Sequence, residues 1–78
     1  MLTVYGKPGC GQCVTAKKLL QDKGIVFEYV DISNDVTALL LVKNLGFKSL
    51  PVIVGSNSMV VGGLKELAAL LSEGDALD

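Results

Sequence analysis

The sequence predicts one α/β domain over residues 1–78, in which three helices flank a four-stranded mixed sheet. Short β-branched and aromatic runs alternate with segments of helical periodicity in the order βαβαββα. Half of the 78 residues are hydrophobic, which suffices for one small core but not for a second domain. The chain's two cysteines are separated by two residues, at the place where the first apolar run meets the first helical pattern.

The first half of the chain predicts a strand, a helix and a second strand. The expected ranges are Leu2–Gly6 for the first strand, Cys10 or Gly11 to Lys23 for the helix, and Ile25–Ile32 for the second strand. In this helix Cys13, Ala16 and Leu20 share one apolar stripe, and Gly24 is the stop signal. Because a helix connects the two strands, we expect them to be parallel and joined by a right-handed crossover.

The second half predicts a helix, a hairpin and a last helix. The expected ranges are Val36–Asn44 for the helix, Val52–Val54 and Met59–Val61 for the strands, Gly55–Ser58 for their turn, and Leu64 to Gly74 for the last helix. The N-cap candidates are Ser33, Asn34 and Asp35, and Gly46 ends the middle helix. The apolar face of the last helix is formed by Leu64, Leu67, Ala68 and Leu71.

The Cys10-x-x-Cys13 pair has the spacing of a dithiol redox site. Residues at i and i+3 of a helical turn lie about 5 Å apart, close enough for a disulfide to open and close with little backbone movement. The helix start stabilises negative charge, so we expect Cys10 to be the attacking thiol. Lys7 could stabilise the Cys10 thiolate or a carboxylate on a substrate, although a solvated surface lysine is an equally simple interpretation.

Other chemistries of a cysteine pair are less consistent with this sequence. The chain has no histidine and no third cysteine, so we expect no metal site within one chain. Metal binding would require a dimer, an external thiol or carboxylate ligands, and the non-enzymatic alternative is a module in which Cys10 and Cys13 of two chains bind zinc or an iron–sulfur cluster. A static disulfide that encloses only two residues restricts the unfolded chain very little, which makes it a poor structural cross-link.

Charge and hydropathy exclude several other classes of function. The net charge is −1 and the seven basic residues are all lysines, which argues against nucleic acid as a partner. No apolar run approaches the roughly 18 residues of a membrane span, and the N-terminus has no export signal, so we expect a cytoplasmic protein. Acidic residues gather toward the C-terminus from Glu66 onward, as expected for a solvated helix end.

Three motifs in this order and spacing resemble the glutaredoxin family of the thioredoxin fold. They are Lys7-x-x-Cys10-x-x-Cys13 after the first strand, Leu50-Pro51-Val52 before the third strand, and Gly62-Gly63 after the fourth strand. The resemblance covers essentially the whole chain. It implies a dithiol–disulfide oxidoreductase in which Cys10 attacks a substrate disulfide and Cys13 resolves the mixed disulfide.

The resemblance also implies roles for residues outside the cysteine pair. The family's proline before the third strand is cis, so Pro51 should turn the backbone of Leu50 toward Cys10, where an extended substrate can pair with it. The backbone amides at Gly62 and Gly63 should receive an anionic group at the start of the last helix. The simpler interpretations are a trans proline that begins an edge strand and a plain strand-to-helix turn.

The residues between and beyond the cysteines bear on the subfamily. Gln12 before the second cysteine is similar to the NrdH-type redoxins, which accept electrons from thioredoxin reductase and reduce ribonucleotide reductase. Leu64-Lys65 stands where glutathione-binding members carry a small or polar residue and an aspartate, and the aromatic residues typical of NrdH-type members at this place are absent. The sequence therefore matches each of the two subfamilies only in part.

The resemblance implies partners as well as chemistry. We expect a disulfide-bearing protein substrate, with ribonucleotide reductase as the first candidate. The electron donor is thioredoxin reductase or glutathione, and the sequence leaves this choice open. We expect no tightly bound cofactor, with glutathione as a candidate co-substrate, and a protein that acts as a monomer away from membranes and nucleic acid.

Overall fold

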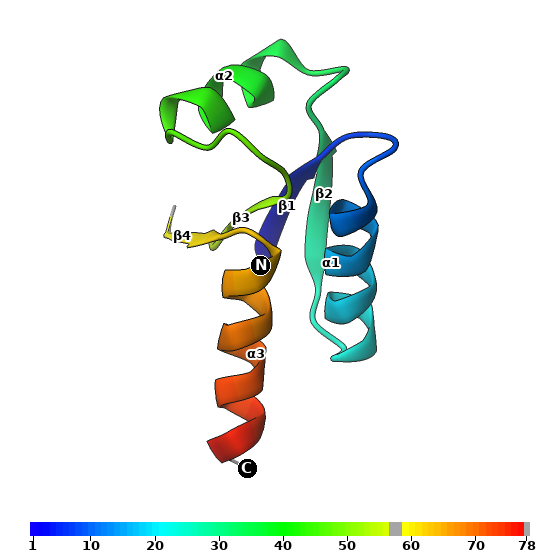
Figure 1. Cartoon of the computed structure of the whole chain (residues 1–78), viewed down its shortest axis with the longest axis vertical. Coiled ribbons are helices and arrows are strands. Elements are labelled where there is room, and N and C mark those ends of the chain that lie inside the picture. The colour runs from blue at the N-terminus through cyan, green and yellow to red at the C-terminus, as the bar shows by residue number, and fades with distance from the viewer. Residues whose placement is uncertain (57–58, 78) are drawn as a thin grey trace.

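The computed structural model describes the backbone of residues 1–56 and 59–77 and the side chains of this part as far as Ser72. Its elements follow the predicted order βαβαββα (Figure 1). They are β1 (Leu2–Gly6), α1 (Gly11–Asp22), β2 (Phe27–Asp31), α2 (Val36–Asn44), β3 (Val52–Val54), β4 (Val60–Gly62) and α3 (Leu64–Leu77).

The four strands form one mixed sheet in the order β2-β1-β3-β4. β1 runs parallel to β2, with Val4 opposite Tyr29 and Gly6 opposite Asp31. β3 is antiparallel to β1 and to β4, so the last two strands form the predicted hairpin. Because β1 is a central strand, the loop that leaves its carboxyl end carries the cysteines to the middle of one sheet edge.

The hydrophobic core lies between the sheet and the helices α1 and α3, which run side by side (Figure 1). Its fully buried members are Val4, Ala16, Leu20, Ile53 and Leu67. The predicted stripe of α1 is confirmed, since its buried residues are Cys13, Ala16 and Leu20. On α3, Leu67 is buried, whereas Ala68 is exposed and does not belong to the buried face. Packing of α1 against β1 therefore holds the first turn of this helix, with Cys13, over the sheet edge.

Several element ends differ from the sequence prediction. β2 begins two residues late because the backbone of Ile25 is used to end α1, donating its N–H to the carbonyl of Leu20 over 3.0 Å. The last helix does not end at Gly74 but continues to Leu77. β4 covers Val60–Gly62 instead of Met59–Val61, and the predicted turn lies partly outside the described residues.

Candidate active site

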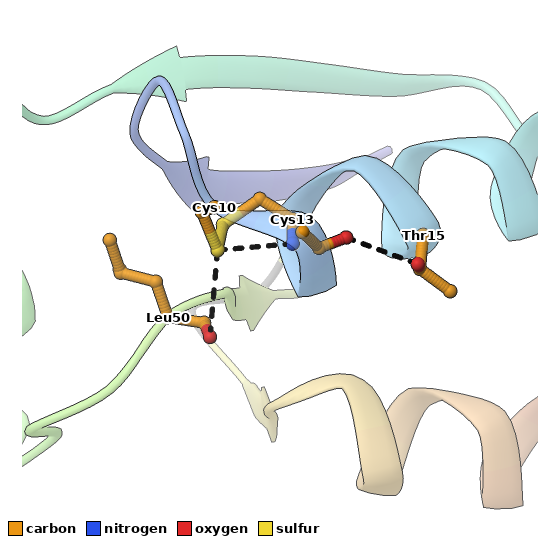
Figure 2. The surroundings of a disulfide bond; sticks show 5 residues. Cys10, Cys13, Thr15 and Leu50 are labelled. Carbon is orange, nitrogen blue, oxygen red and sulfur yellow. Dashed lines mark hydrogen bonds between the residues drawn. A yellow bond between two sulfur atoms is a disulfide. The ribbon is translucent and has the colours of Figure 1, made fainter.

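Cys10 and Cys13 form a disulfide at the N-terminus of α1 (Figure 2). Their Cα atoms are 5.3 Å apart, close to the separation that the helical spacing predicts. Cys10 is half-buried, whereas Cys13 is only 1% exposed because it faces the sheet. A molecule that approaches from solvent therefore reaches the sulfur of Cys10 and not that of Cys13.

The start of α1 is built around the sulfur of Cys10. Cys10 is the N-cap residue, with extended backbone angles of φ −91° and ψ 107°. The backbone N–H of Cys13 donates a hydrogen bond to Cys10 Sγ over 3.2 Å (Figure 2). This N–H has no carbonyl partner within the helix, and a thiolate is a stronger acceptor than a neutral sulfur. The geometry therefore favours negative charge on Cys10 when the disulfide is open.

The loop before β3 also reaches the sulfur of Cys10. The Leu50–Pro51 peptide bond is cis, as predicted, and Pro51 is buried. The carbonyl oxygen of Leu50 lies 3.9 Å from Cys10 Sγ, a distance at which a protonated thiol can donate to it (Figure 2). Cys10 is thus placed between a donor suited to its thiolate and an acceptor suited to its thiol.

Cys10 opens onto a groove of about 650 Å³ between the cysteine loop, α2 and the loop that leads to β3. Three lysines line it, Lys7, Lys43 and Lys48, together with apolar side chains such as Leu39 and Phe47. No acidic residue is found among the described residues that line the groove. Its chemistry therefore suits a ligand that carries both negative charge and apolar groups.

The two ends of α2 determine where the chain enters and leaves the groove. Sequence reasoning alone does not identify the groove residues that these ends position. The Asp35 side chain accepts a hydrogen bond from the N–H of Ala38 over 3.0 Å, so the predicted N-cap is confirmed. At the other end, Gly46 has φ 87°, and Phe47 donates its N–H to the carbonyl of Val42 over 3.4 Å. This reversal of the chain directs Phe47 to the groove. The sequence signal that could have indicated this position of Phe47 is a glycine followed by an apolar residue.

The side chain of Glu66 lies against the two glycines that precede α3. The N–H of Gly63 donates a hydrogen bond to Glu66 Oε1 over 2.8 Å. Glu66 is the third residue of α3, which is the position from which a glutamate caps its own helix start. Gly62 has φ 121°, and a Cβ at this position would lie 2.8 Å from Glu66 Cγ. Glu66 is therefore a capping residue. The Gly63 amide, expected to receive an anion from a ligand, donates its hydrogen bond to the Glu66 carboxylate.

Other expected site residues lie at the surface near the cysteines. Lys7 is exposed and lines the groove, and Gln12 is exposed on the first turn of α1. Within the part of the chain that the structure describes, no group of three or more metal-ligating side chains is found. Across the same residues, none of the helices combines the length and apolar character that a membrane span needs.

Known proteins resemble this chain in both sequence and structure. The glutaredoxin family profile matches residues 2–60. The glutaredoxin-like protein NrdH of Lactococcus lactis is 38% identical over 53 residues, which cover 68% of this chain and 74% of that protein. A hybrid peroxiredoxin of Haemophilus influenzae is 34% identical over 67 residues. That match covers 85% of this chain but 27% of the peroxiredoxin, so it concerns only a part of that protein.

The fold agrees with these sequence relationships. The solved structure of a glutaredoxin from Brucella melitensis superposes with a TM-score of 0.75 at 35% sequence identity. The superposition covers 96% of this chain and 82% of the Brucella protein. The family profile, the sequence relative and the solved structure therefore agree on the glutaredoxin family and its fold. The chain therefore belongs to the glutaredoxin family and is a thiol–disulfide oxidoreductase.

Proposed function

We propose that this protein reduces disulfides in protein substrates and that ribonucleotide reductase is its first substrate to test. The observation that carries the proposal is the unequal exposure of the two cysteines beside a groove that can hold a polypeptide. The relationship to the glutaredoxin-like protein NrdH supports the choice of substrate, because the resemblance to NrdH-type redoxins implies ribonucleotide reductase as the protein that is reduced.

The reaction proceeds by two thiol–disulfide exchanges. The Cys10 thiolate attacks one sulfur of the substrate disulfide, that S–S bond breaks, and the other substrate sulfur leaves as a thiolate. The Cys13 thiolate then attacks Cys10 Sγ in the mixed disulfide and releases the second substrate thiolate. Both released thiolates take protons from solvent. Two electrons have passed to the substrate, and the protein is left with the Cys10–Cys13 disulfide.

The groove suggests how a substrate is held during these steps. An extended peptide whose cysteine reaches Cys10 can place its backbone against Leu50, as an added strand pairs with an exposed sheet edge. Its acidic side chains would then lie near Lys43 and Lys48, and its apolar side chains near Phe47. We therefore propose that the substrate cysteine is flanked by acidic and apolar residues.

We further propose thioredoxin reductase as the electron donor. Two observations support this choice, the NrdH relationship and the Glu66 carboxylate on the N–H of Gly63. A glutathione carboxylate directed to this helix start would lose a hydrogen-bond donor and would meet a like charge. Glutathione is the second candidate, favoured by Lys7 and Lys48 in the groove, which could bind its other carboxylate.

Coupled oxidation of NADPH tests the choice of electron donor. The protein is supplied with a small disulfide and either thioredoxin reductase or glutathione with glutathione reductase. We expect turnover with thioredoxin reductase and little with glutathione, and the reverse result would overturn the choice of donor.

A second experiment tests the roles of the two cysteines. The Cys13→Ser variant should trap oxidised ribonucleotide reductase on Cys10 as a mixed disulfide, detected by mass spectrometry. Absence of this adduct, with Cys10→Ser as the control, would contradict the proposed roles.

A further inference from the structure

The side chains of Tyr29 and Cys13 both approach Gly6, the last residue of β1. A Cβ on Gly6 would lie 2.5 Å from the hydroxyl oxygen of Tyr29 and 2.9 Å from Cys13 Sγ. Both atoms therefore crowd the same small space, which exists because residue 6 has no side chain. Nothing in the reaction described above uses Tyr29.

The position of Tyr29 is fixed by its neighbours on both strands and on α1. Its residue pairs with Val4 across the parallel strands, and its ring packs against the hydrophobic core. Lys17 Nζ lies over this ring, 4.2 Å from its centroid, in the geometry of a cation–π contact. Lys17 follows Cys13 by one helical turn, so the helix that carries the sulfur also contacts this ring.

The Tyr29 hydroxyl is a hydrogen-bond donor and not a base. Burial and then the negative charge of Asp31 raise the pKa of Tyr29 above its usual value of 10.0, so the phenol keeps its proton at neutral pH. Asp31 is itself hydrogen-bonded by Ser33 and Asn34. In the disulfide form, the hydroxyl of Tyr29 has no hydrogen-bond partner among the described residues.

We propose that the Tyr29 hydroxyl donates a hydrogen bond to the Cys13 thiolate that forms when the disulfide opens, and thereby shifts the dithiol toward its reduced form. The inference rests on thiol–disulfide exchange at Cys10 and Cys13 but not on the identity of the substrate or the donor. A disulfide sulfur is a weak acceptor, whereas a thiolate is a strong one, so the hydroxyl interacts with the reduced state preferentially.

The step in which Tyr29 acts is the reduction of the protein by an external thiolate. That thiolate attacks Cys10 Sγ, the Cys10–Cys13 bond breaks, and the electron pair goes to Cys13 Sγ. Tyr29 retains its own proton and donates a hydrogen bond to the new anion. The charged groups that face Tyr29 are Lys17, which extends from α1 over its ring, and Asp31 on the same strand.

The first test measures the reduction potential of Tyr29→Phe in dithiothreitol redox buffers. The variant keeps the ring, its packing and the Lys17 contact, and it removes only the hydroxyl. We expect the equilibrium between dithiol and disulfide to move about tenfold toward the disulfide, which corresponds to a potential lower by about 30 mV. Tyr5→Phe is the matched control, because Tyr5 lies on the opposite face of the sheet with the pocket-lining residues Thr3 and Val54, and it should leave the potential unchanged.

The second test measures Cys13 alone, in a protein that carries Cys10→Ser. The rate of alkylation of Cys13 is followed by mass spectrometry as a function of pH, with and without Tyr29→Phe. We expect the hydroxyl to favour the thiolate, so its removal should raise the pH at which alkylation reaches half its maximal rate by about one unit. An unchanged potential together with an unchanged pH profile overturns the inference, even if Tyr29→Phe lowers the melting temperature. Neither readout depends on the physiological donor, so a wrong donor assignment leaves this result intact.

Discussion

The carboxylate of Glu66 accepts a hydrogen bond from the backbone N–H of Gly63 over 2.8 Å, and so occupies the start of α3 with a charge from the same helix. This contact has two separable consequences. It stabilises the helix, as a residue at the third helical position does when it caps the N-terminus. It also places a negative charge where related proteins are expected to receive an anion.

Replacing Glu66 tests both consequences in one variant. We expect Glu66→Ala to lower the free energy of unfolding by about 1 kcal/mol, because a capping interaction is lost. It should also raise turnover with glutathione, because the Gly63 amide becomes free and the repelling charge is gone. Urea denaturation measures the first effect and the coupled glutathione assay measures the second. A fall in glutathione turnover would instead assign Glu66 to glutathione binding. Glu28→Ala, which removes the same charge from the exposed face of β2, is the control.

The groove lysines should matter only for acidic substrates. We expect Lys43→Ala and Lys48→Ala each to lower kcat/KM for a disulfide peptide with acidic flanks by about twofold to fivefold, the range of an exposed ion pair. The loss should shrink as salt is raised, and a peptide with neutral flanks should be unaffected. Lys18→Ala removes an exposed lysine of α1 that does not line the groove and serves as the control. Equal losses for both peptides would contradict the binding role.

The space above Gly6 should tolerate no side chain. We expect Gly6→Ala to destabilise the fold by about 1–3 kcal/mol, because the new Cβ overlaps both Tyr29 and Cys13. Tyr29→Phe removes the nearer of the two contacts, so the double variant should recover part of this loss in a double-mutant cycle. Gly11→Ala meets no atom within 4 Å and is the matched control. Additive effects of the two substitutions would show that the Tyr29 hydroxyl does not lie where we place it.

Stability should fall at alkaline pH in a way that depends on Tyr29. The pKa of Tyr29 is raised in the folded protein, so the unfolded chain loses this proton first as pH rises. The contribution of Tyr29 to the free energy of unfolding is fully present below its pKa in the unfolded chain, about 10. It is lost as pH rises through the pKa in the folded protein. Urea denaturation between neutral and alkaline pH measures this dependence. We expect a shallower decline for Tyr29→Phe than for the parent protein, and an identical decline in both would contradict the shifted pKa.

Local signals in the sequence predict the backbone of this protein well. Gly24 and Gly46 end helices as predicted, with φ of 69° and 87°, because in each case the next residue is apolar and its N–H returns to a helix carbonyl. Gly74 carries the same glycine signal but is followed by Asp75, and α3 continues past it. A glycine alone is therefore a weaker stop signal than a glycine followed by an apolar residue.

The chemistry of the cysteine pair could also be predicted, because it depends on spacing along one turn of helix. The cis bond at Pro51 followed from the family resemblance and not from the residues themselves. The Glu66–Gly63 contact could have been anticipated from the capping pattern but is ambiguous without the exact helix start. The meeting of Tyr29 with Cys13 depends on the register of two strands and on the packing of α1, which no local pattern specifies.

The burial of Cys13 has a consequence for damage by oxidants. A peroxide that enters the groove meets Cys10 first, and its thiolate is converted to a sulfenic acid. Because Cys13 lies within disulfide distance but is only 1% exposed, it can condense with that sulfenic acid while remaining shielded itself. The product is the same Cys10–Cys13 disulfide that ordinary turnover forms. Inactivation by irreversible overoxidation is thus diverted into the disulfide that the electron donor of ordinary turnover reduces.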